Sequence, residues 1–287
     1  MKKLFDIINN KACLLLFTQI VFFLTTQAQN KIEFIENKNQ WENHILFKAE
    51  MKNAAIFLEE KSLCFNFLSD EDSHTNHGHT SVPKQKSLCE EVHFHAYKIE
   101  FLNSKIDKSK IQGFSPKKSY NNYFLGNNPE RWASFVRKYK TVEYKDLYNN
   151  IDLKIYSINE NLKYDFVLRK GGDIGEIELF YEGVEKIEIK NGNLIISTTV
   201  NKIAELKPFA YQIINNDTIK IACKYKLKGN SLFFEIDENY DKSKNLVIDP
   251  TLVFSNYSGS TADNWGFTAT FDLNQNVYSG GIVSGIG

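Results

Sequence analysis

The chain has little proline, cysteine or methionine, and neither sign of charge is in excess. Its 287 residues include 5 Pro, 4 Cys and 2 Met, and 35 basic residues balance 35 acidic ones. A balanced charge provides no strong electrostatic attraction to nucleic acid or to an acidic membrane surface. Four cysteines are also too few for a disulfide-rich scaffold. The composition therefore argues against a nucleic-acid-binding protein and against a small disulfide-stapled domain.

Long hydrophobic runs are absent after the first thirty residues. The N-terminus carries Lys2, Lys3 and Lys11, an apolar stretch over residues 12–24 and small residues just before Gln29. This order predicts a secretory signal peptide over residues 1–28. A transmembrane anchor is the competing interpretation, but the apolar stretch is shorter than the roughly 20 residues that a span needs. We therefore expect a secreted, extracellular protein with no transmembrane segment after cleavage; attachment to the outer-membrane surface is the alternative location.

The mature chain keeps three cysteines, Cys64, Cys89 and Cys223. Because three is an odd number, no more than one intramolecular disulfide can form and one thiol is left over. Cys64 and Cys89 can pair if their strands are neighbours. The alternative, that all three are buried small hydrophobic residues, is equally consistent with the sequence.

Alternating apolar and polar residues dominate the mature chain. The 22 Phe and 14 Tyr favour strands, and the period of two is typical of half-buried strands. Residues 55–59 and 62–68 predict a hairpin, and residues 92–102 predict one long strand. Asn191-Gly192 and Gly229-Asn230 each separate two strand patterns, as two-residue hairpin turns do. The pattern predicts an all-β fold of sandwich-like subdomains built from antiparallel hairpins.

The segments suggest an order of domains along the chain. Asn128, Pro129 and Glu130 resemble the start of a helix, so we expect a short helix near residues 129–135 with Trp132 and Phe135 docked on a sheet. A polar, lysine-rich stretch predicts a linker. The expected organisation is a signal peptide (1–28), an N-terminal β subdomain (29–104) with a His-rich loop (69–91), a linker (105–122), a second β subdomain (123–250) and the start of a β-propeller repeat (251–287).

Five segments together resemble a known group of proteins: "IEFIENKNQW", "NNYFLGNNPERWAS", "NLKYDFVLRKGGDIGEIELFYEG", "KPFAYQI" and "LVIDPTLVFSNYSGSTADNWGFTATFD". They are similar to secreted surface proteins of the Bacteroidota, in which an N-terminal all-β domain precedes seven-bladed β-propeller-type repeats. Many of these proteins carry gliding-motility-associated or type IX secretion C-terminal domains. The resemblance implies that residues 251–287 begin the first propeller repeat, with Gln275 where the family usually has Gly. We therefore expect this chain to be an N-terminal fragment of a longer protein.

Histidines form the sharpest local anomaly. Five of the six lie close together, and imidazole is a good ligand for zinc. A zinc site at this segment is one hypothesis, and a polar loop that binds nothing specific is the other. The candidate metal ligands are His74, His77, His79, His93 and His95.

Other patterns that resemble catalytic or metal sites are weaker. Residues 272–276 have the Asp-x-Asn-x-Asn spacing of a calcium loop, but the sixth position is Val277 rather than Gly. Asp152, Asp165 and Glu100 lie opposite the apolar faces of their strands, so we expect them to face solvent. No catalytic or cofactor-binding residue is assigned.

Clustered aromatic residues could stack on sugar rings, although we expect most of them to pack in the core. They are Trp41, Tyr120, Tyr123, Phe124, Trp132, Tyr139 and Tyr144. The resemblance and the absence of a catalytic motif favour a non-catalytic structural or adhesion module that precedes a β-propeller. Its partners would be cell-envelope or extracellular proteins or glycans. The alternatives are a secreted carbohydrate-active or hydrolytic protein whose catalytic part is missing, and a metal-binding module.

Overall fold

The computed structural model describes residues 32–51, 53–69, 92–158, 161–237, 239–253, 264–271 and 277–283. The expected signal peptide, the calcium-like loop and the His-rich stretch 70–91 lie outside these ranges. Within the described ranges the helices are three short 3-10 turns, and none is long and apolar enough to cross a membrane. Strands account for most of the described residues, so the all-β prediction is confirmed.

The 3-10 turns are η1 (Lys108–Lys110), η2 (Pro129–Arg131) and η3 (Ile174–Glu176). The strands, in chain order, are β1 (Phe34–Glu36), β2 (Ile45–Met51), β3 (Ala54–Glu59), β4 (Ser62–Leu68), β5 (Phe94–Phe101), β6 (Ile111–Tyr123), β7 (Ala133–Tyr148), β8 (Ile151–Ile158), β9 (Asn161–Leu168), β10 (Leu179–Glu182), β11 (Lys186–Lys190), β12 (Asn193–Ser197), β13 (Lys202–Ile214), β14 (Asp217–Ile221), β15 (Cys223–Lys228), β16 (Ser231–Ile236), β17 (Leu246–Val253), β18 (Asn264–Phe271) and β19 (Val277–Val283).

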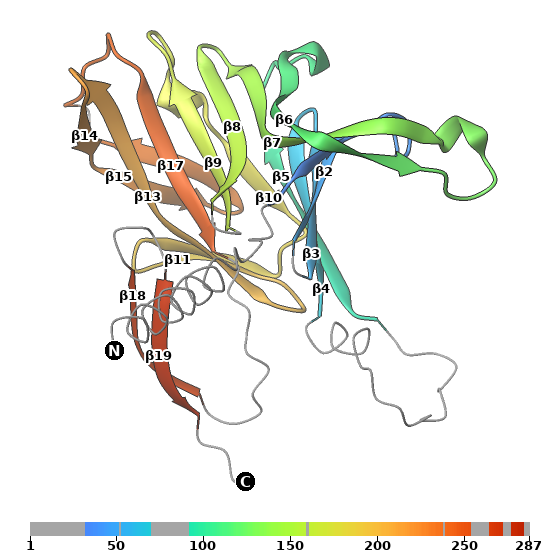
Figure 1. Cartoon of the computed structure of the whole chain (residues 1–287). Coiled ribbons are helices and arrows are strands. Elements are labelled where there is room, and N and C mark those ends of the chain that lie inside the picture. The colour runs from blue at the N-terminus through green and yellow to red at the C-terminus, as the bar shows by residue number, and fades with distance from the viewer. Residues whose placement is uncertain are drawn as a thin grey trace, which may run out of the picture. The chain divides into compact units, whose positions relative to one another are not determined.

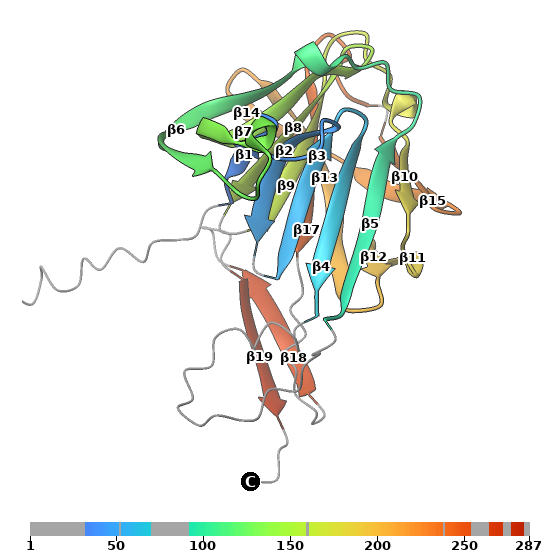
Figure 2. The same cartoon turned by 90° about the vertical axis from the view of Figure 1, so that its right-hand side faces the viewer.

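Strands β1–β17 form one antiparallel network with two runs of neighbours. One run is β6-β7-β8-β9-β17-β13, and β13 continues it with β12 and β11 at one end and β14 at the other. The second run is β1-β2-β3-β4-β5-β10-β16-β15. The pairing of β1 with β7 joins the two runs. The network curls back on itself in a barrel-like way, with β8, β9 and β17 on one side and β2–β5 on the other (Figures 1 and 2).

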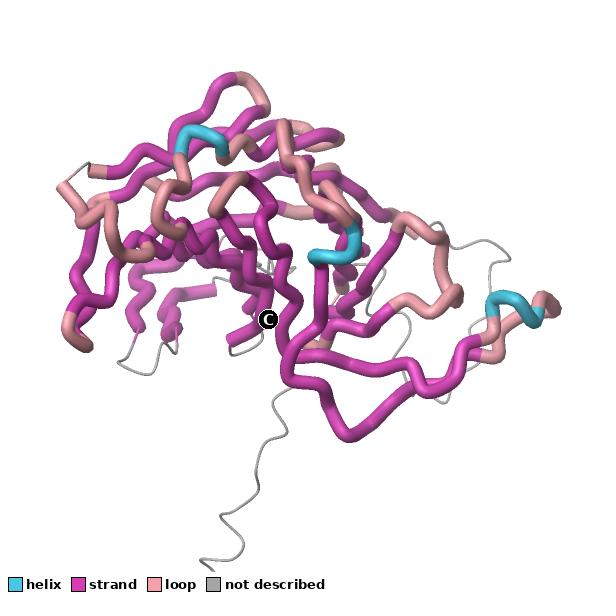
Figure 3. The backbone as a smooth tube through the Cα atoms, turned by 90° about the horizontal axis from the view of Figure 1, so that it is seen from above, coloured by secondary structure: helices cyan, strands magenta, loops and turns pink. Residues whose placement is uncertain are grey.

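A single hydrophobic core fills the space between the two runs. It takes Phe34, Phe65 and Tyr97 from the second run and Tyr144 and Phe166 from the first, all of them buried. Strand side chains alternate between faces, so every second residue of a strand reaches this core. Seen from above, the strands curve around it (Figure 3).

The predicted hairpins are confirmed where their turns are local. Lys190 pairs with Asn193 across Asn191-Gly192, whose φ angles are 52° and 84°. Both angles lie in the left-handed region that this turn requires, which Asn and Gly tolerate best. Lys228 likewise pairs with Ser231 across Gly229-Asn230. The hairpin β3–β4 is also confirmed.

The expected division into two subdomains is wrong within the described residues. Most of the expected linker, residues 111–122, belongs to β6, which pairs with β7. Buried side chains that precede this segment in the sequence and buried side chains that follow it belong to the same hydrophobic cluster. A boundary at residue 250 is also wrong, because β17 continues to Val253 and pairs with β13 beyond Pro250. The strand passes the proline at a register shift in this pairing.

The expected helix over residues 129–135 is also wrong. Asn128 accepts a hydrogen bond from the Glu130 amide, but the helical turn ends at Arg131 and β7 begins at Ala133. The cap signal is local and one 3-10 turn satisfies it, whereas the alternation that follows favours a strand. Trp132 and Phe135 do not dock on a sheet, because both side chains are exposed.

At the C-terminal end, β18 and β19 pair with each other in a separate two-stranded sheet. The expectation that it begins a propeller repeat stays a prediction.

Candidate functional site: the aromatic arm

The outer part of the β6–β7 hairpin extends away from the rest of the network, and we call residues 114–140 the arm (Figure 1). Six of the twelve large hydrophobic side chains that are exposed among the described residues lie on it. Scattered exposed hydrophobic residues are ordinary, whereas a contiguous group marks a contact surface. The six are Phe114, Tyr120, Phe124, Leu125, Trp132 and Phe135.

The exposed aromatic residues of the arm form two ring pairs. Tyr120 and Phe135 have ring centroids 4.9 Å apart, and Phe124 and Trp132 meet edge to face at 5.9 Å. The Trp132 indole donates a hydrogen bond to the Gly126 carbonyl oxygen at 3.3 Å. These contacts hold the rings in place while half or more of the Tyr120 and Phe135 side chains, 51% and 63%, stays exposed.

Only one face of the arm is covered. Ile35, Ala133 and Val136 form a small buried cluster, and Trp41 and Tyr123 pack against it. Val136 and Ala133 pair with Asn121 and Tyr123 across the hairpin, so these residues share that face. Tyr120 pairs with Arg137, which lies one residue along from Val136 and so points to the opposite face. The open face therefore carries an aromatic ring and a guanidinium side by side.

A backbone irregularity brings Phe135 to the open face. The register of β6 and β7 shifts between Asn121 and Tyr123, and β7 has the extra residue there. Phe135 has a φ of 52°, in the left-handed region that is costly for a bulky side chain. Its amide donates a hydrogen bond to Asn122 Oδ1 at 2.9 Å. Strained residues of this kind persist at functional sites more often than elsewhere.

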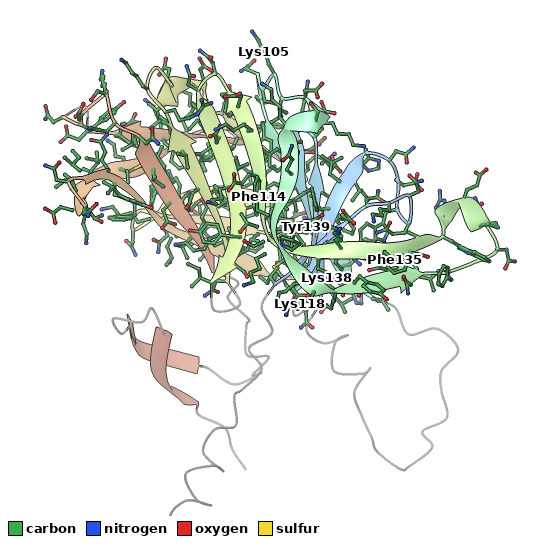
Figure 4. The ribbon with its side chains drawn as sticks, turned by 45° about the horizontal axis from the view of Figure 1, so that its top comes forward. Lys105, Phe114, Lys118, Phe135, Lys138 and Tyr139 are labelled. Atoms are coloured by element: carbon green, nitrogen blue, oxygen red, sulfur yellow. The ribbon has the colours of Figure 1, made fainter. Side chains whose placement is uncertain are left out.

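At the base of the arm, Gly113 makes room for an aromatic ring. A Cβ at Gly113 would lie 2.4 Å from Cγ of Tyr139, so the Tyr139 ring lies directly over the glycine. Tyr139 also meets Phe47 edge to face at 5.9 Å and donates a hydrogen bond to Glu36 Oε2. These contacts fix the point where the arm leaves the core (Figure 4).

The arm is basic although the protein as a whole is neutral. Residues 114–140 contain six basic side chains and one acidic side chain, Glu130. Lys117 and Lys138 pair with Glu33 at 2.8 and 3.5 Å, and Arg131 pairs with Glu42 at 2.8 Å. Burial raises the pKa of Glu33, but Lys117 and then Lys138 outweigh it and leave that pKa below its usual value.

Three basic side chains of the arm are exposed and form no ion pair with another described residue: Lys118, Arg137 and Lys140. Figure 4 shows Lys118 and Lys138 near the base of the arm and Phe135 farther out. Positive charge therefore accompanies the exposed rings along the arm.

The free edge of β6 is poorly suited to adding another strand. Pro116 lacks a backbone N–H, and Lys117 and Lys118 follow it. Proline and lysine are the residues with which natural proteins protect exposed edges. We therefore expect the arm to contact a partner through its aromatic face rather than through strand addition.

A second cluster lies deep in the core around Glu205, which is fully buried. Tyr164 and Tyr225 donate hydrogen bonds to Glu205 Oε1 at 2.5 and 2.6 Å, and Tyr181 donates to Oε2 at 3.5 Å. Burial raises the pKa of Glu205 more than these hydrogen bonds lower it. The Tyr97 hydroxyl is buried without a hydrogen-bond partner among the described residues. The cluster links the two runs of strands. Because none of its side chains is exposed, it is not positioned to meet a substrate.

Asp165 contradicts the expectation that it faces solvent, because only 8% of it is exposed. Tyr156 donates to its two carboxylate oxygens at 3.2 and 3.0 Å, and Lys163 pairs with Asp249 at 2.7 Å. Burial, and then the charge of Asp249, raise the pKa of Asp165 to about 7. β9 is covered on both faces, so alternation does not separate its core-facing side from a solvent-facing side.

The other two carboxylates expected to face solvent are partly exposed. The Asp152 side chain is 16% exposed, pairs with Lys145 at 2.5 Å and lies 3.3 Å from Arg169 Nε. Glu100 is half-buried on β5.

An open cleft of about 950 Å³ is lined by residues of β9, β15, β16 and β17 and by the turns beside them. On its charged rim Glu235 is already paired: Lys226 and Lys224 bind it at 2.6 and 2.9 Å and lower its pKa to about 2. Cys223 lines the cleft, and burial raises its pKa to about 12, which disfavours the reactive thiolate. These groups do not form an acid–base pair.

Of the five candidate metal ligands, the structure describes His93 and His95. His95 Nδ1 lies 3.0 Å from Thr199 Oγ1 and Nε2 lies 2.7 Å from the Gly183 carbonyl oxygen, so both ring nitrogens are in use. Within the described ranges no three His, Cys, Asp or Glu side chains are grouped to hold a metal. His74, His77 and His79 lie outside these ranges, and zinc binding by the tract stays a prediction. Cys64 and Cys223 are free thiols.

The expectation that the aromatic residues mostly pack in the core holds for some and fails for others. Tyr144 is fully buried, and Tyr139, Trp41 and Tyr123 are half-buried. Tyr120, Phe124 and Trp132 are exposed on the arm. Sequence reasoning missed Phe114 and Leu125 as surface residues. The signal that could have found them is the coincidence of apolar residues with a lysine-rich stretch.

Comparison with known proteins gives a family and no nearer relative. No curated protein and no solved structure matches the chain significantly. A family model described as a domain of unknown function (DUF7948) matches residues 34–251, which include the whole arm and both runs of strands. Because this match covers more than half of the chain, the protein belongs to the DUF7948 family.

Proposed function

We propose that the chain is a non-catalytic, secreted cell-surface module whose aromatic arm makes adhesive contacts. One observation carries this proposal: half of the exposed large hydrophobic side chains among the described residues lie on one protruding hairpin. Such a concentration costs solubility and is retained where a partner covers it. The arm also holds its rings in fixed pairs, which reduces the entropy lost on binding.

The resemblance to Bacteroidota surface proteins supports the setting of this module. In that setting the chain is exported by its signal peptide, precedes a β-propeller and belongs to a gliding-motility-associated or type IX-secreted protein. The barrel-like core would then serve to hold the arm at a fixed distance from the residues that follow Val253. Its partners are extracellular proteins or glycans.

Bead retention under flow tests the adhesive role. Beads that carry the purified chain are passed over a lawn of Bacteroidota cells, and the retained fraction is counted. The double variant Tyr120→Ala, Trp132→Ala removes one ring from each pair. Its retention should fall roughly fivefold or more, since a few exposed anchors carry most of a contact.

Ile213→Ala, Ile219→Ala is the matched control, because these side chains are 61% and 46% exposed on β13 and β14, away from the arm. Control beads should be retained like the wild type. Equal retention of wild-type and arm-variant beads would contradict the proposal.

A further inference from the structure

The arm combines exposed aromatic rings with exposed basic side chains. Its ring pairs, Tyr120–Phe135 and Phe124–Trp132, follow one another along its length. Phe124 lies four positions after Tyr120, a distance of about 13 Å in an extended chain. The rings thus form two successive apolar platforms, as suits an elongated partner rather than a compact one.

The charge of the arm points to the chemistry of that partner. Arg137 lies directly across from Tyr120 on the open face, and Lys118 and Lys140 are exposed nearby in the sequence. None of the three forms an ion pair with another described residue, although the other three basic residues of the arm do. Cations that lack an ion-pair partner complement the negative groups of an anionic polymer, and the apolar rings beside them complement its apolar faces.

Resting on the adhesive role proposed above, we propose that the arm binds an acidic polysaccharide. The apolar faces of the sugar rings lie on Tyr120–Phe135 and on Phe124–Trp132. The carboxylates of the polymer pair with Arg137, Lys118 and Lys140, and guanidinium is the best of these groups for holding a carboxylate through two hydrogen bonds. The blocked edge of β6 leaves the aromatic face as the contact surface.

Titration with alginate, a polyuronate, tests the proposal, and dextran serves as the neutral polymer. The wild-type chain should bind alginate at least tenfold more tightly than dextran. Affinity for alginate should fall severalfold between low and physiological salt, because exposed charges are screened.

Two variants separate the rings from the charges. Tyr120→Ala, Trp132→Ala should weaken alginate binding about tenfold with an unchanged salt dependence. Lys118→Gln, Arg137→Gln should weaken it severalfold and flatten the salt dependence. Lys61→Gln, Lys170→Gln removes the same charge from exposed residues off the arm and should bind like the wild type.

Equal binding of alginate and dextran, or alginate binding that neither arm variant changes, would overturn the acidic-polysaccharide proposal. So would an absence of alginate binding, even where the Tyr120→Ala, Trp132→Ala beads lose retention on cells. In that last case the adhesive role stands, and the partner is a protein or a neutral glycan.

Discussion

Two groups of aromatic residues in this protein have opposite surroundings. Tyr97, Tyr164, Tyr181 and Tyr225 lie in the core around Glu205, whereas Tyr120 and its neighbours on the arm lie in solvent. In the core, tyrosine hydroxyls satisfy a buried carboxylate and thereby join the two runs of strands. On the arm, the rings contact each other and leave one face open. Aromatic side chains therefore stabilise the fold in one region and form an exposed surface in the other.

Removing the acceptor of the core cluster should have the largest effect on stability. Glu205→Ala removes the carboxylate acceptor of the buried Tyr164 and Tyr181 hydroxyls and opens a cavity, so the free energy of unfolding should fall by about 4 kcal/mol. Urea unfolding followed by circular dichroism measures this loss. Glu205→Gln keeps an acceptor oxygen at the same place and should lose less than half as much. An Ala variant as stable as the wild type would show that the cluster does not hold the two runs together.

Asp165 provides the next largest effect, and it depends on pH. Its pKa is near 3.8 when unfolded and about 7 when folded, so the folded chain holds a proton that the unfolded chain releases. The stabilising contribution is complete below about pH 4 and is lost as pH rises through about 7, by up to about 1.4 kcal/mol per pH unit.

Asp165→Asn removes that titration, while Tyr156, Lys154, Asp249, Tyr211 and Lys163 still surround the site. The variant should therefore match the wild type near pH 4 and be more stable by up to about 4 kcal/mol near pH 8. Urea unfolding at the two pH values compares them. Parallel curves for the two proteins would mean that Asp165 is ionised in the folded chain.

Phe135 should be far less important for stability than a core phenylalanine. Phe135→Gly relieves a left-handed backbone conformation and loses one exposed ring contact, so stability should change by no more than about 1 kcal/mol. Lys38 donates to the Phe135 carbonyl oxygen, a bond that glycine can keep. Phe166→Gly, at a fully buried position, should cost more than about 4 kcal/mol. A similar cost at the two positions would remove the distinction between arm and core.

The smallest effect is expected from the variant that weakens binding. Tyr120→Ala, Trp132→Ala should shift the free energy of unfolding by less than about 1 kcal/mol, because both side chains are exposed and surface substitutions are mild. Thermal unfolding of this variant beside the Ile213→Ala, Ile219→Ala control measures the shift. A large loss would show that the arm rings support the fold and would undermine the binding comparison.

Much of the fold could be predicted from sequence because hairpin signals are local. Asn191-Gly192 and Gly229-Asn230 fix their turns with neighbouring residues alone, and strand alternation identifies β5 and its buried Tyr97. The helix at residues 129–135 was predicted wrongly because its cap signal is equally compatible with a single 3-10 turn. The linker was predicted wrongly because a strand that leaves the core loses its apolar alternation.

The candidate site was less predictable because exposure depends on which strands lie opposite. Glu205 follows Ile203 in the apolar phase of β13, a signal that a core-facing carboxylate needs partners, but the tyrosines that meet it come from three other strands. Trp132 and Tyr144 are both aromatic residues in or next to the same strand pattern, yet only Tyr144 is covered by a second layer of strands. No local pattern contains that information.

Hydroxyl-radical footprinting with mass spectrometry tests most directly whether the aromatic residues form these two populations. In the free chain, Tyr120, Phe124, Trp132 and Phe135 should be oxidised rapidly, while Tyr97, Tyr164, Tyr181 and Tyr225 should react only after unfolding. Alginate should then protect the arm residues and leave the rates of the core residues unchanged. Slow oxidation of the arm rings in the free chain, or rapid oxidation of the tyrosines around Glu205, would contradict the account.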